Sequence, residues 1–261
     1  METVRSDDGT TIAFERSGDG PPLVLVLGAF NDRRSKPELA ALLAGHFTVY
    51  AYDRRGRGDS GDDPIYAVAR EIDDLAAVVC TAARDAGEAG VRVFGHSSGA
   101  VLALRAAAAG VPIARLAVFD PPVAVIDGTP TPGDLAARLT AEVAAGRRDT
   151  AARLFLTEAV GMPPQVVAMI EDGPGWPALT ALAHTLPYDV TITDAALSPA
   201  LLATIGVPAL IVDGGANPAF LQEAASAVAT AIPDAEHVTL ADQTHDEDPA
   251  VLAPVLVEFL A

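Results

Sequence analysis

Short apolar runs recur along the chain, and most of them lack alternation between apolar and polar positions. Residues 23–27, Leu-Val-Leu-Val-Leu, are the clearest case, and a run of this kind is typical of a strand that is covered on both faces. Between most of the runs lie segments whose apolar residues have helical spacing. Strand and helix therefore alternate, which predicts an α/β fold with a mostly parallel central sheet. The other strand-like runs are residues 47–51, 91–94, 115–119, 207–212 and 235–240.

The N-terminal segment has a different pattern. Residues 3–5 and 11–15 alternate in short bursts around Asp8-Gly9, a dipeptide that favours a tight hairpin turn. We therefore expect an antiparallel start to the sheet.

One long interval interrupts the rhythm of strand and helix. Residues 127–203 have helical patterns without an intervening core strand, so we interpret them as an insertion into a core formed by residues 1–126 and 204–261. Gly and Pro clusters divide this insertion into several short helices. The expected helices are residues 133–145, 149–160, 164–171 and 177–186.

Composition narrows the class of protein. Half of the 261 residues are apolar, which favours a single packed domain, and 35 acidic against 17 basic residues give a net charge of −18. Such a charge repels nucleic acids and anionic membranes, so a small-molecule substrate is the expected partner. No apolar leader or membrane-length run is present in the sequence, so we expect a cytoplasmic protein. The sequence does not determine its oligomeric state. The single cysteine, Cys80, is expected to pack in a helix.

The pentapeptide at residues 95–99, Gly-His-Ser-Ser-Gly, matches the pattern G-x-S-x-G. A strand-like segment precedes it and a helix-like segment follows, which is the context in which a sharp turn exposes a nucleophilic serine. Ser97 is therefore the candidate nucleophile. The N–H of Ser98, at the start of the helix, would donate to a developing oxyanion. A glycine-serine turn without chemistry is the alternative interpretation.

A serine hydroxyl needs a base, and His245 is the best placed of the five histidines. It follows the last predicted strand and precedes Asp248-Pro249, a typical helix start, so it lies in a loop at the edge of the sheet where Ser97 is expected. The neighbouring acidic residues 246–248 would stabilise its charged form if the fold keeps them close. His96 adjoins the nucleophile and is a candidate pocket residue.

With these features the chain resembles the α/β-hydrolase family over residues 3–260. Residues 27–30 are similar to the family's oxyanion loop, and residues 53–60, Asp-Arg-Arg-Gly-Arg-Gly-Asp-Ser, are similar to its D-x-R-G-x-G-x-S turn. The resemblance implies an α/β-hydrolase fold, a second oxyanion N–H from Ala29, and an inserted helical cap. It also implies pocket residues in that cap, although ordinary helix packing is the alternative for each: Met162, Trp176, His184 and Leu186.

The third member of the catalytic triad departs from the usual family pattern. The usual acid position holds a neutral amide, Asn217, which can orient an imidazole but cannot stabilise its charge. Some relatives carry the acid after the sixth strand, where this chain has Asp120. We favour Asp120, with Asp213 as one alternative and Asn217, or no acid, as the other.

These residues predict a serine hydrolase that cleaves an ester, lactone or thioester through an acyl-enzyme on Ser97, with His245 as base. No metal or other cofactor is expected, since neither a metal-ligand spacing nor a nucleotide-binding glycine pattern is present in the sequence. Two alternatives stay open. The same pair could perform C–C bond hydrolysis or cofactor-free haloperoxidase and perhydrolase chemistry, or the chain could be a ligand-binding protein without turnover.

Overall fold

The computed structural model describes residues 1–124 and 133–261. Eight strands of these residues form one sheet in the order β1-β2-β4-β3-β5-β6-β7-β8. β1 and β2 are antiparallel to each other, β2 is antiparallel to β4, and the remaining pairs are parallel. The strands are β1 (Glu2–Arg5), β2 (Thr11–Ser17), β3 (Pro22–Val26), β4 (Thr48–Tyr52), β5 (Val91–His96), β6 (Ile113–Phe119), β7 (Ala209–Gly214) and β8 (Ala235–Leu240).

This sheet confirms the predicted α/β-hydrolase fold with its antiparallel start. The position of β3 in the sheet explains why the run at residues 23–27 is apolar at every position. In β3, Leu23 and Leu25 pack into one buried cluster, whereas Val24 and Val26 pack into another on the opposite face. A strand covered by helices on both faces has no water-facing side for polar residues to occupy.

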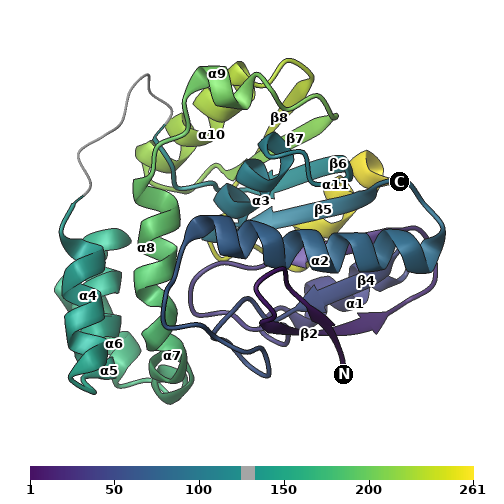
Figure 1. Cartoon of the computed structure of the whole chain (residues 1–261). Helices are drawn as coiled ribbons and strands as arrows, with labels where there is room; N and C mark the ends of the chain where they lie inside the picture. Colours follow the sequence, from purple (N-terminus) through teal and green to yellow (C-terminus); the bar gives the residue numbers. More distant parts are fainter. Residues whose placement is uncertain (125–132) are drawn as a thin grey trace.

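Helices cover the two faces of the sheet, as Figure 1 shows. Residues of α1 and α11 contribute to the cluster on one face, and residues of α2, α3 and α10 contribute to the cluster on the other. The covering helices are α1 (Pro37–Ala44), α2 (Val68–Ala86), α3 (Ser98–Ala108), α10 (Ala219–Ala231) and α11 (Pro249–Leu260).

Further helices follow β6 and precede β7. All but the last, which contacts α10, form a separate group at one end of the sheet (Figure 1). Most of the buried apolar residues of this group form a third apolar cluster, against which Ala29 and Phe30 of the loop after β3 pack. The proposed boundary between residues 126 and 127 lies outside the described residues. The helices are α4 (Leu135–Ala144), α5 (Arg148–Leu154), a π-helical turn η1 (Phe155–Ala159), α6 (Pro164–Glu171), α7 (Trp176–Leu182), a 3₁₀ turn η2 (Ala183–Thr185), α8 (Leu186–Asp194) and α9 (Pro199–Leu202).

Two expectations for local structure were wrong. The helix expected over 177–186 ends at Leu182, and α8 begins at Leu186, because Pro187 favours the first turn of a new helix over the interior of an existing one. Cys80 is exposed on α2 and does not pack in the core, because the buried residues of that helix face the sheet on its other side.

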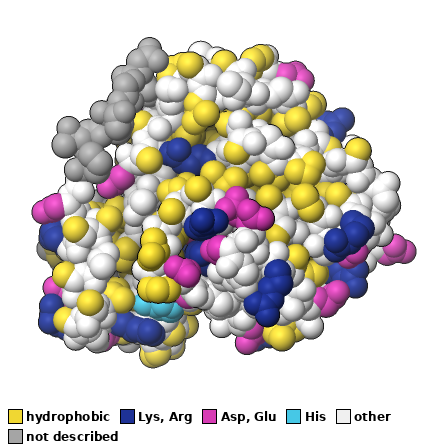
Figure 2. Space-filling model, viewed as in Figure 1, with side chains coloured by type: hydrophobic (Ala, Val, Ile, Leu, Met, Phe, Trp, Pro, Cys, Tyr) yellow, Lys and Arg dark blue, Asp and Glu magenta, His cyan; other side chains and the backbone are white. Residues whose placement is uncertain are grey.

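The surface in Figure 2 carries basic and acidic side chains next to one another, with apolar side chains between them. Among the exposed residues, Arg16 pairs with Glu2 and Asp85, and Arg70 pairs with Asp73. Of the helices in residues 1–124 and 133–261, none combines the length and the apolar character that a membrane crossing requires.

Candidate active site

Ser97 lies in a strained turn between β5 and α3. Its backbone has φ 58° and ψ −128°, and α3 begins at the next residue, Ser98. A Cβ on Gly99 would lie 2.1 Å from the carbonyl oxygen of Val26, so only glycine permits this close approach of α3 to β3. Residues other than glycine rarely adopt a positive φ, and the surrounding packing holds Ser97 in that conformation. Ser97 is half-buried at the end of β5.

His245 lies in the loop between β8 and α11 and reaches Ser97 across the edge of the sheet. Its Nε2 is 3.0 Å from the Ser97 hydroxyl oxygen, a hydrogen-bonding distance. The imidazole is 37% exposed, so the pair is open to a ligand from solvent. A base in this position can accept the serine proton.

Asp120 follows β6 and lies on the other side of the imidazole. Its carboxylate oxygen Oδ2 is 3.1 Å from His245 Nδ1, and the residue is completely buried. The backbone N–H of Gly214 donates to the other oxygen, Oδ1, at 3.2 Å. Asp120 itself has φ 47°, so Asp120 and Ser97 both adopt a backbone conformation that residues other than glycine rarely adopt. An acceptor at Nδ1 favours the imidazole tautomer whose Nε2 is free to receive the proton of Ser97.

Asn217 contacts the carboxylate and not the imidazole. Its Nδ2 donates a 2.6 Å hydrogen bond to Asp120 Oδ2, the oxygen that also faces His245. Asn217 is buried, so this bond is shielded from water. The amide therefore orients Asp120, which is a different role from the direct contact with histidine considered from the sequence.

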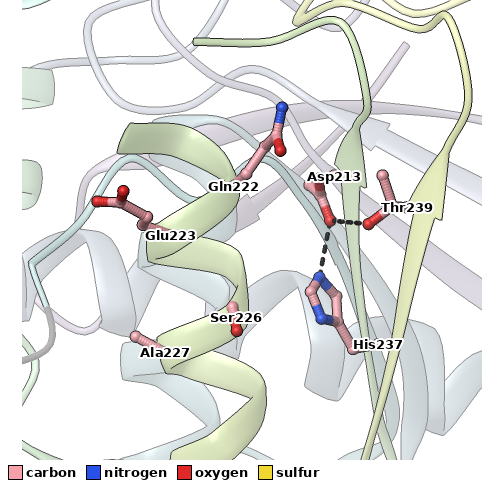
Figure 3. Close-up of a pocket in the computed structure, with 7 residues that line it drawn as sticks. All are labelled: Asp213, Gln222, Glu223, Ser226, Ala227, His237 and Thr239. Carbon is pink, nitrogen blue, oxygen red and sulfur yellow. Dashed lines mark hydrogen bonds and ion pairs between the residues drawn. The ribbon is translucent and has the colours of Figure 1, made fainter. Parts of the chain in front are cut away.

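Asp213 points toward His237 and Thr239, as Figure 3 shows. Its Oδ1 accepts hydrogen bonds from His237 Nε2 at 2.7 Å and from Thr239 Oγ1 at 2.9 Å. These side chains border a cavity of about 480 Å³ that does not include Ser97 or His245. Strand geometry explains the outcome, since consecutive residues point to opposite faces, and Asp213 points toward β8 and α10. The residues that line the cavity are Asp213, Gln222, Glu223, Ser226, Ala227, His237 and Thr239.

The two residues expected to supply oxyanion donors belong to segments that adjoin Ser97. Ser98 is the first residue of α3, so its N–H has no acceptor within the helix. A Cβ on Gly28 would lie 2.7 Å from Ser97 Cβ, which places the loop after β3 directly against the candidate nucleophile. Ala29 follows in that loop. The arrangement can stabilise negative charge on an oxygen bound between the two N–H groups.

The pocket residues expected from the sequence have varied surroundings. Leu186 and Trp176 are buried in the third apolar cluster, and Trp176 Nε1 donates to Asp149 Oδ1 at 2.8 Å, so both pack within the helical group. Met162 is half-buried against the same cluster. His184 Nε2 lies 2.7 Å from the carbonyl oxygen of Gly56 and borders a second cavity of about 510 Å³ that also includes Phe30.

His96 contacts the backbone of the candidate base. It is buried, stacks on Phe119 with ring centroids 5.7 Å apart, and its Nε2 lies 3.0 Å from the carbonyl oxygen of His245. The same nitrogen lies 3.3 Å from Glu247, whose carboxylate also pairs with Lys36 at 3.0 Å. These contacts hold the loop that carries His245.

The acidic residues beside His245 were expected to stabilise its charged form, but the hydrogen bonds of its ring go to Asp120 and Ser97. Asp246 is exposed, Asp248 caps α11 by accepting from Ala250 N, and Glu247 is buried against His96 and Lys36. Lys36 was not identified from the sequence as part of this site, and Glu247 was expected to stabilise the charged form of His245, not to pair with His96 and Lys36. The only local signal was an acidic residue next to the candidate histidine, because 211 positions separate Lys36 from Glu247.

Glu247 gives a testable dependence of stability on pH. Burial raises the pKa of Glu247, but the hydrogen bond with His96 and the charges of His96 and Lys36 outweigh it and lower the pKa from 4.5 to about 2. The ionised form therefore stabilises the fold fully above pH 4.5, and this contribution is lost as the pH falls toward 2. At neutral pH it is on the order of 3 kcal/mol.

We expect the difference in free energy of unfolding between wild type and Glu247→Gln to shrink by about 2 kcal/mol between pH 7 and pH 3. Urea denaturation across this range measures it. Asp246→Asn is the control, because Asp246 is 98% exposed and its difference from wild type should stay within about 0.5 kcal/mol. A constant difference for Glu247→Gln at every pH would contradict the role of this carboxylate.

Comparison with known proteins identifies the family and supports the fold. A protein-family model described as the alpha/beta hydrolase family matches residues 23–255. An alpha/beta hydrolase from Sphaerobacter thermophilus, known from its crystal structure, is 53% identical in sequence to this chain. The two structures align with a TM-score of 0.90 over 100% of both chains. A thermophilic esterase from Thermogutta terrifontis has the same fold at 24% identity, with a TM-score of 0.79 and coverage of 99% of this chain and 97% of that one.

A curated relative matches over a shorter region. The N-formylmaleamate deformylase of Pseudomonas putida is 38% identical over 109 residues, which are 41% of this chain. The match spans 39% of the length of the deformylase.

Proposed function

Because the chain belongs to the alpha/beta hydrolase family, we propose that it is a serine hydrolase that cleaves an ester, lactone or thioester of a small to medium organic substrate. The observation that carries the proposal is the chain of contacts from Ser97 through His245 to Asp120, at 3.0 and 3.1 Å. Its order and geometry fit the activation of a serine by a histidine that a buried carboxylate orients.

The proposed reaction has two halves. The Ser97 oxygen forms a bond to the substrate carbonyl carbon while His245 takes the serine proton, and the N–H groups of Ala29 and Ser98 bind the oxyanion. The bond to the leaving group then breaks as His245 delivers the proton to it. Water attacks the acyl-enzyme, gives a proton to His245, and the acid leaves as Ser97 regains its hydrogen. Asp120 stabilises the imidazolium in both halves.

The surroundings of Ala29 favour an apolar substrate. Phe30 packs edge-on against Phe155 of η1, with ring centroids 5.4 Å apart, and half-buried Met162 belongs to the same apolar cluster. We propose that the helical segment between β6 and β7 forms a cap whose apolar side chains contact the acyl or alcohol part of the substrate. The thermophilic esterase of the same fold is consistent with the hydrolysis of an ester.

Labelling with a fluorophosphonate tests the proposal directly. The Ser97 oxygen is expected to displace fluoride from phosphorus, so intact-mass measurement should show one adduct on the wild-type protein. Ser97→Ala should lose the adduct, whereas the matched control Ser98→Ala keeps the nucleophile and should still be labelled. An unlabelled wild-type protein, or an adduct that persists in Ser97→Ala, would contradict the proposal.

A further inference from the structure

Asp189 of α8 lies beneath the residues that flank Ser97, although it belongs to the helical segment inserted between β6 and β7. It is 1% exposed, and its carboxylate binds three side chains of the core. Oδ1 accepts from the Ser98 hydroxyl at 2.6 Å and from Arg54 Nη1 at 2.8 Å, and Oδ2 accepts from Arg57 Nη2 at 2.8 Å. One carboxylate thus contacts Ser98 directly and also binds Arg57, which in turn binds the loop after β3.

The first connection runs through Ser98. The side chain of Ser98 is buried and points to Asp189, while its backbone N–H is one of the two proposed oxyanion donors. Ser98 follows Ser97, whose φ of 58° is strained, and the carbonyl oxygen of Ser97 accepts from Ala100 N at 2.8 Å. The bond to Asp189 therefore fixes the side chain of a residue whose backbone must keep one orientation.

The second connection runs through Arg57. While its Nη2 binds Asp189, its Nη1 donates to the carbonyl oxygen of Gly28 and, at 3.1 Å, to that of Asn31. The carbonyl of Gly28 and the N–H of Ala29 belong to one planar, trans peptide group and point in opposite directions. Holding the Gly28 oxygen therefore fixes the plane of this peptide group and with it the direction of the Ala29 N–H.

Charge balance explains how this cluster tolerates burial. Arg54 and Arg57 are paired with the carboxylates of Asp189 and Glu71, and Arg54 Nε binds Glu71 at 2.7 Å. Burial raises the pKa of Asp189, but the positive charges of Arg57 and Arg54 outweigh it and lower the pKa below its usual value. Asp189 is therefore ionised, and removing its charge would leave Arg57 without its carboxylate partner.

We propose that Asp189 is a positioning residue that orients both oxyanion donors, Ala29 through Arg57 and Ser98 directly. The inserted helical segment would then be part of the catalytic apparatus and more than a cover over it. This inference rests on the proposed function, because it assigns the two N–H groups to an oxyanion.

Asp189→Asn is the test variant, because asparagine keeps the shape of the side chain and removes its charge. We expect kcat for p-nitrophenyl acetate to fall about 10- to 100-fold with KM within about twofold, since oxyanion donors act in the transition state and not on bound substrate. Phenyl trifluoromethyl ketone, which forms an oxyanion on reaction with serine, should bind more weakly by the same factor.

Asp74→Asn is the matched control. Asp74 is also 1% exposed and pairs with a buried arginine, Arg55, at 2.7 Å, but this pair makes no contact with Gly28 or Ser98. Asp74→Asn should lower the melting temperature and leave kcat per titrated active site unchanged. Equal effects of the two variants on kcat, or a rise in KM alone for Asp189→Asn, would overturn the proposal.

Ser98→Ala gives a second test if Asp189→Asn folds poorly. It removes only the hydroxyl that binds Asp189 and keeps the backbone N–H, so kcat should fall about 3- to 10-fold without a change in KM. In the double variant the two losses should combine to less than their product, because both remove the same contact. An unchanged kcat in Ser98→Ala would overturn the direct connection.

Amide hydrogen exchange separates this inference from the proposed function. If wild type neither reacts with the fluorophosphonate nor hydrolyses the ester, the proposed function fails, but the orientation of the two loops can still be measured. Exchange at residues 27–31 and 97–101 should be faster in Asp189→Asn than in wild type or Asp74→Asn. Equal exchange in all three proteins would overturn the positioning role.

Discussion

Replacing His245 with alanine is expected to lower kcat for p-nitrophenyl acetate by about 10⁵- to 10⁶-fold, the loss seen when a serine hydrolase loses its general base. The reason is geometric, because His245 Nε2 lies 3.0 Å from the Ser97 oxygen and takes its proton in the proposed mechanism. Steady-state kinetics on protein of verified fold measures the loss. Free imidazole added to the alanine variant should restore part of the activity, since it can occupy the space of the missing ring.

His237→Ala is the control for this experiment. His237 is also a partly exposed histidine that contacts an aspartate, Asp213, at 2.7 Å, but it lies on β8 beside the cavity of Figure 3. Its removal should change kcat by less than about threefold. Comparable losses for the two histidine variants, or activity in His245→Ala near that of wild type, would exclude His245 as the base.

Asp120→Asn is expected to lower kcat by about 10⁴-fold, as in serine proteases whose orienting aspartate becomes asparagine. The carboxylate lies 3.1 Å from His245 Nδ1 and is completely buried. Solvent therefore cannot take over its stabilisation of the imidazolium. An amide could also turn its NH₂ toward Nδ1 and so favour the wrong imidazole tautomer. Steady-state kinetics at saturating substrate measures this effect.

Two other substitutions complete the comparison. Asp213→Asn should retain activity within about threefold, because Asp213 contacts His237 and Thr239 and not His245. Asn217→Ala should lower kcat about tenfold, because it removes the 2.6 Å hydrogen bond that orients Asp120. A larger loss in Asp213→Asn than in Asp120→Asn would reverse the assignment of the acid.

Much of the fold was predictable because the pattern of apolar and polar residues in a strand follows which of its faces are buried. The run at 23–27 is apolar throughout since both faces of β3 are covered, and the turn at Asp8-Gly9 fits the antiparallel start. Ser97 was similarly visible, because the glycines and the strand and helix around it are local features. Such signals depend on neighbours in sequence, so a single chain displays them.

The acid of the candidate triad was only partly predictable. Asp120 follows β6, Asp213 is the last but one residue of β7, and Asn217 lies three residues beyond β7. All three lie near the same edge of the sheet, and no local pattern says which side chain reaches residue 245. In the structure, Asn217 and Gly214 both donate to Asp120, so the usual acid position supports the carboxylate of another strand. The choice depends on contacts across 94 to 125 positions of the chain.

The sequence by itself determined the order of strands and helices, the sharp turn at Ser97 and the loop position of His245, because periodicity, glycine and capping residues act over a few neighbouring positions. Only the tertiary structure decided which carboxylate meets His245 and that Asp189, 91 positions from Ser98, lies beneath it. Buried charges are placed by partners that must compensate their desolvation, and those partners come from distant elements of the fold.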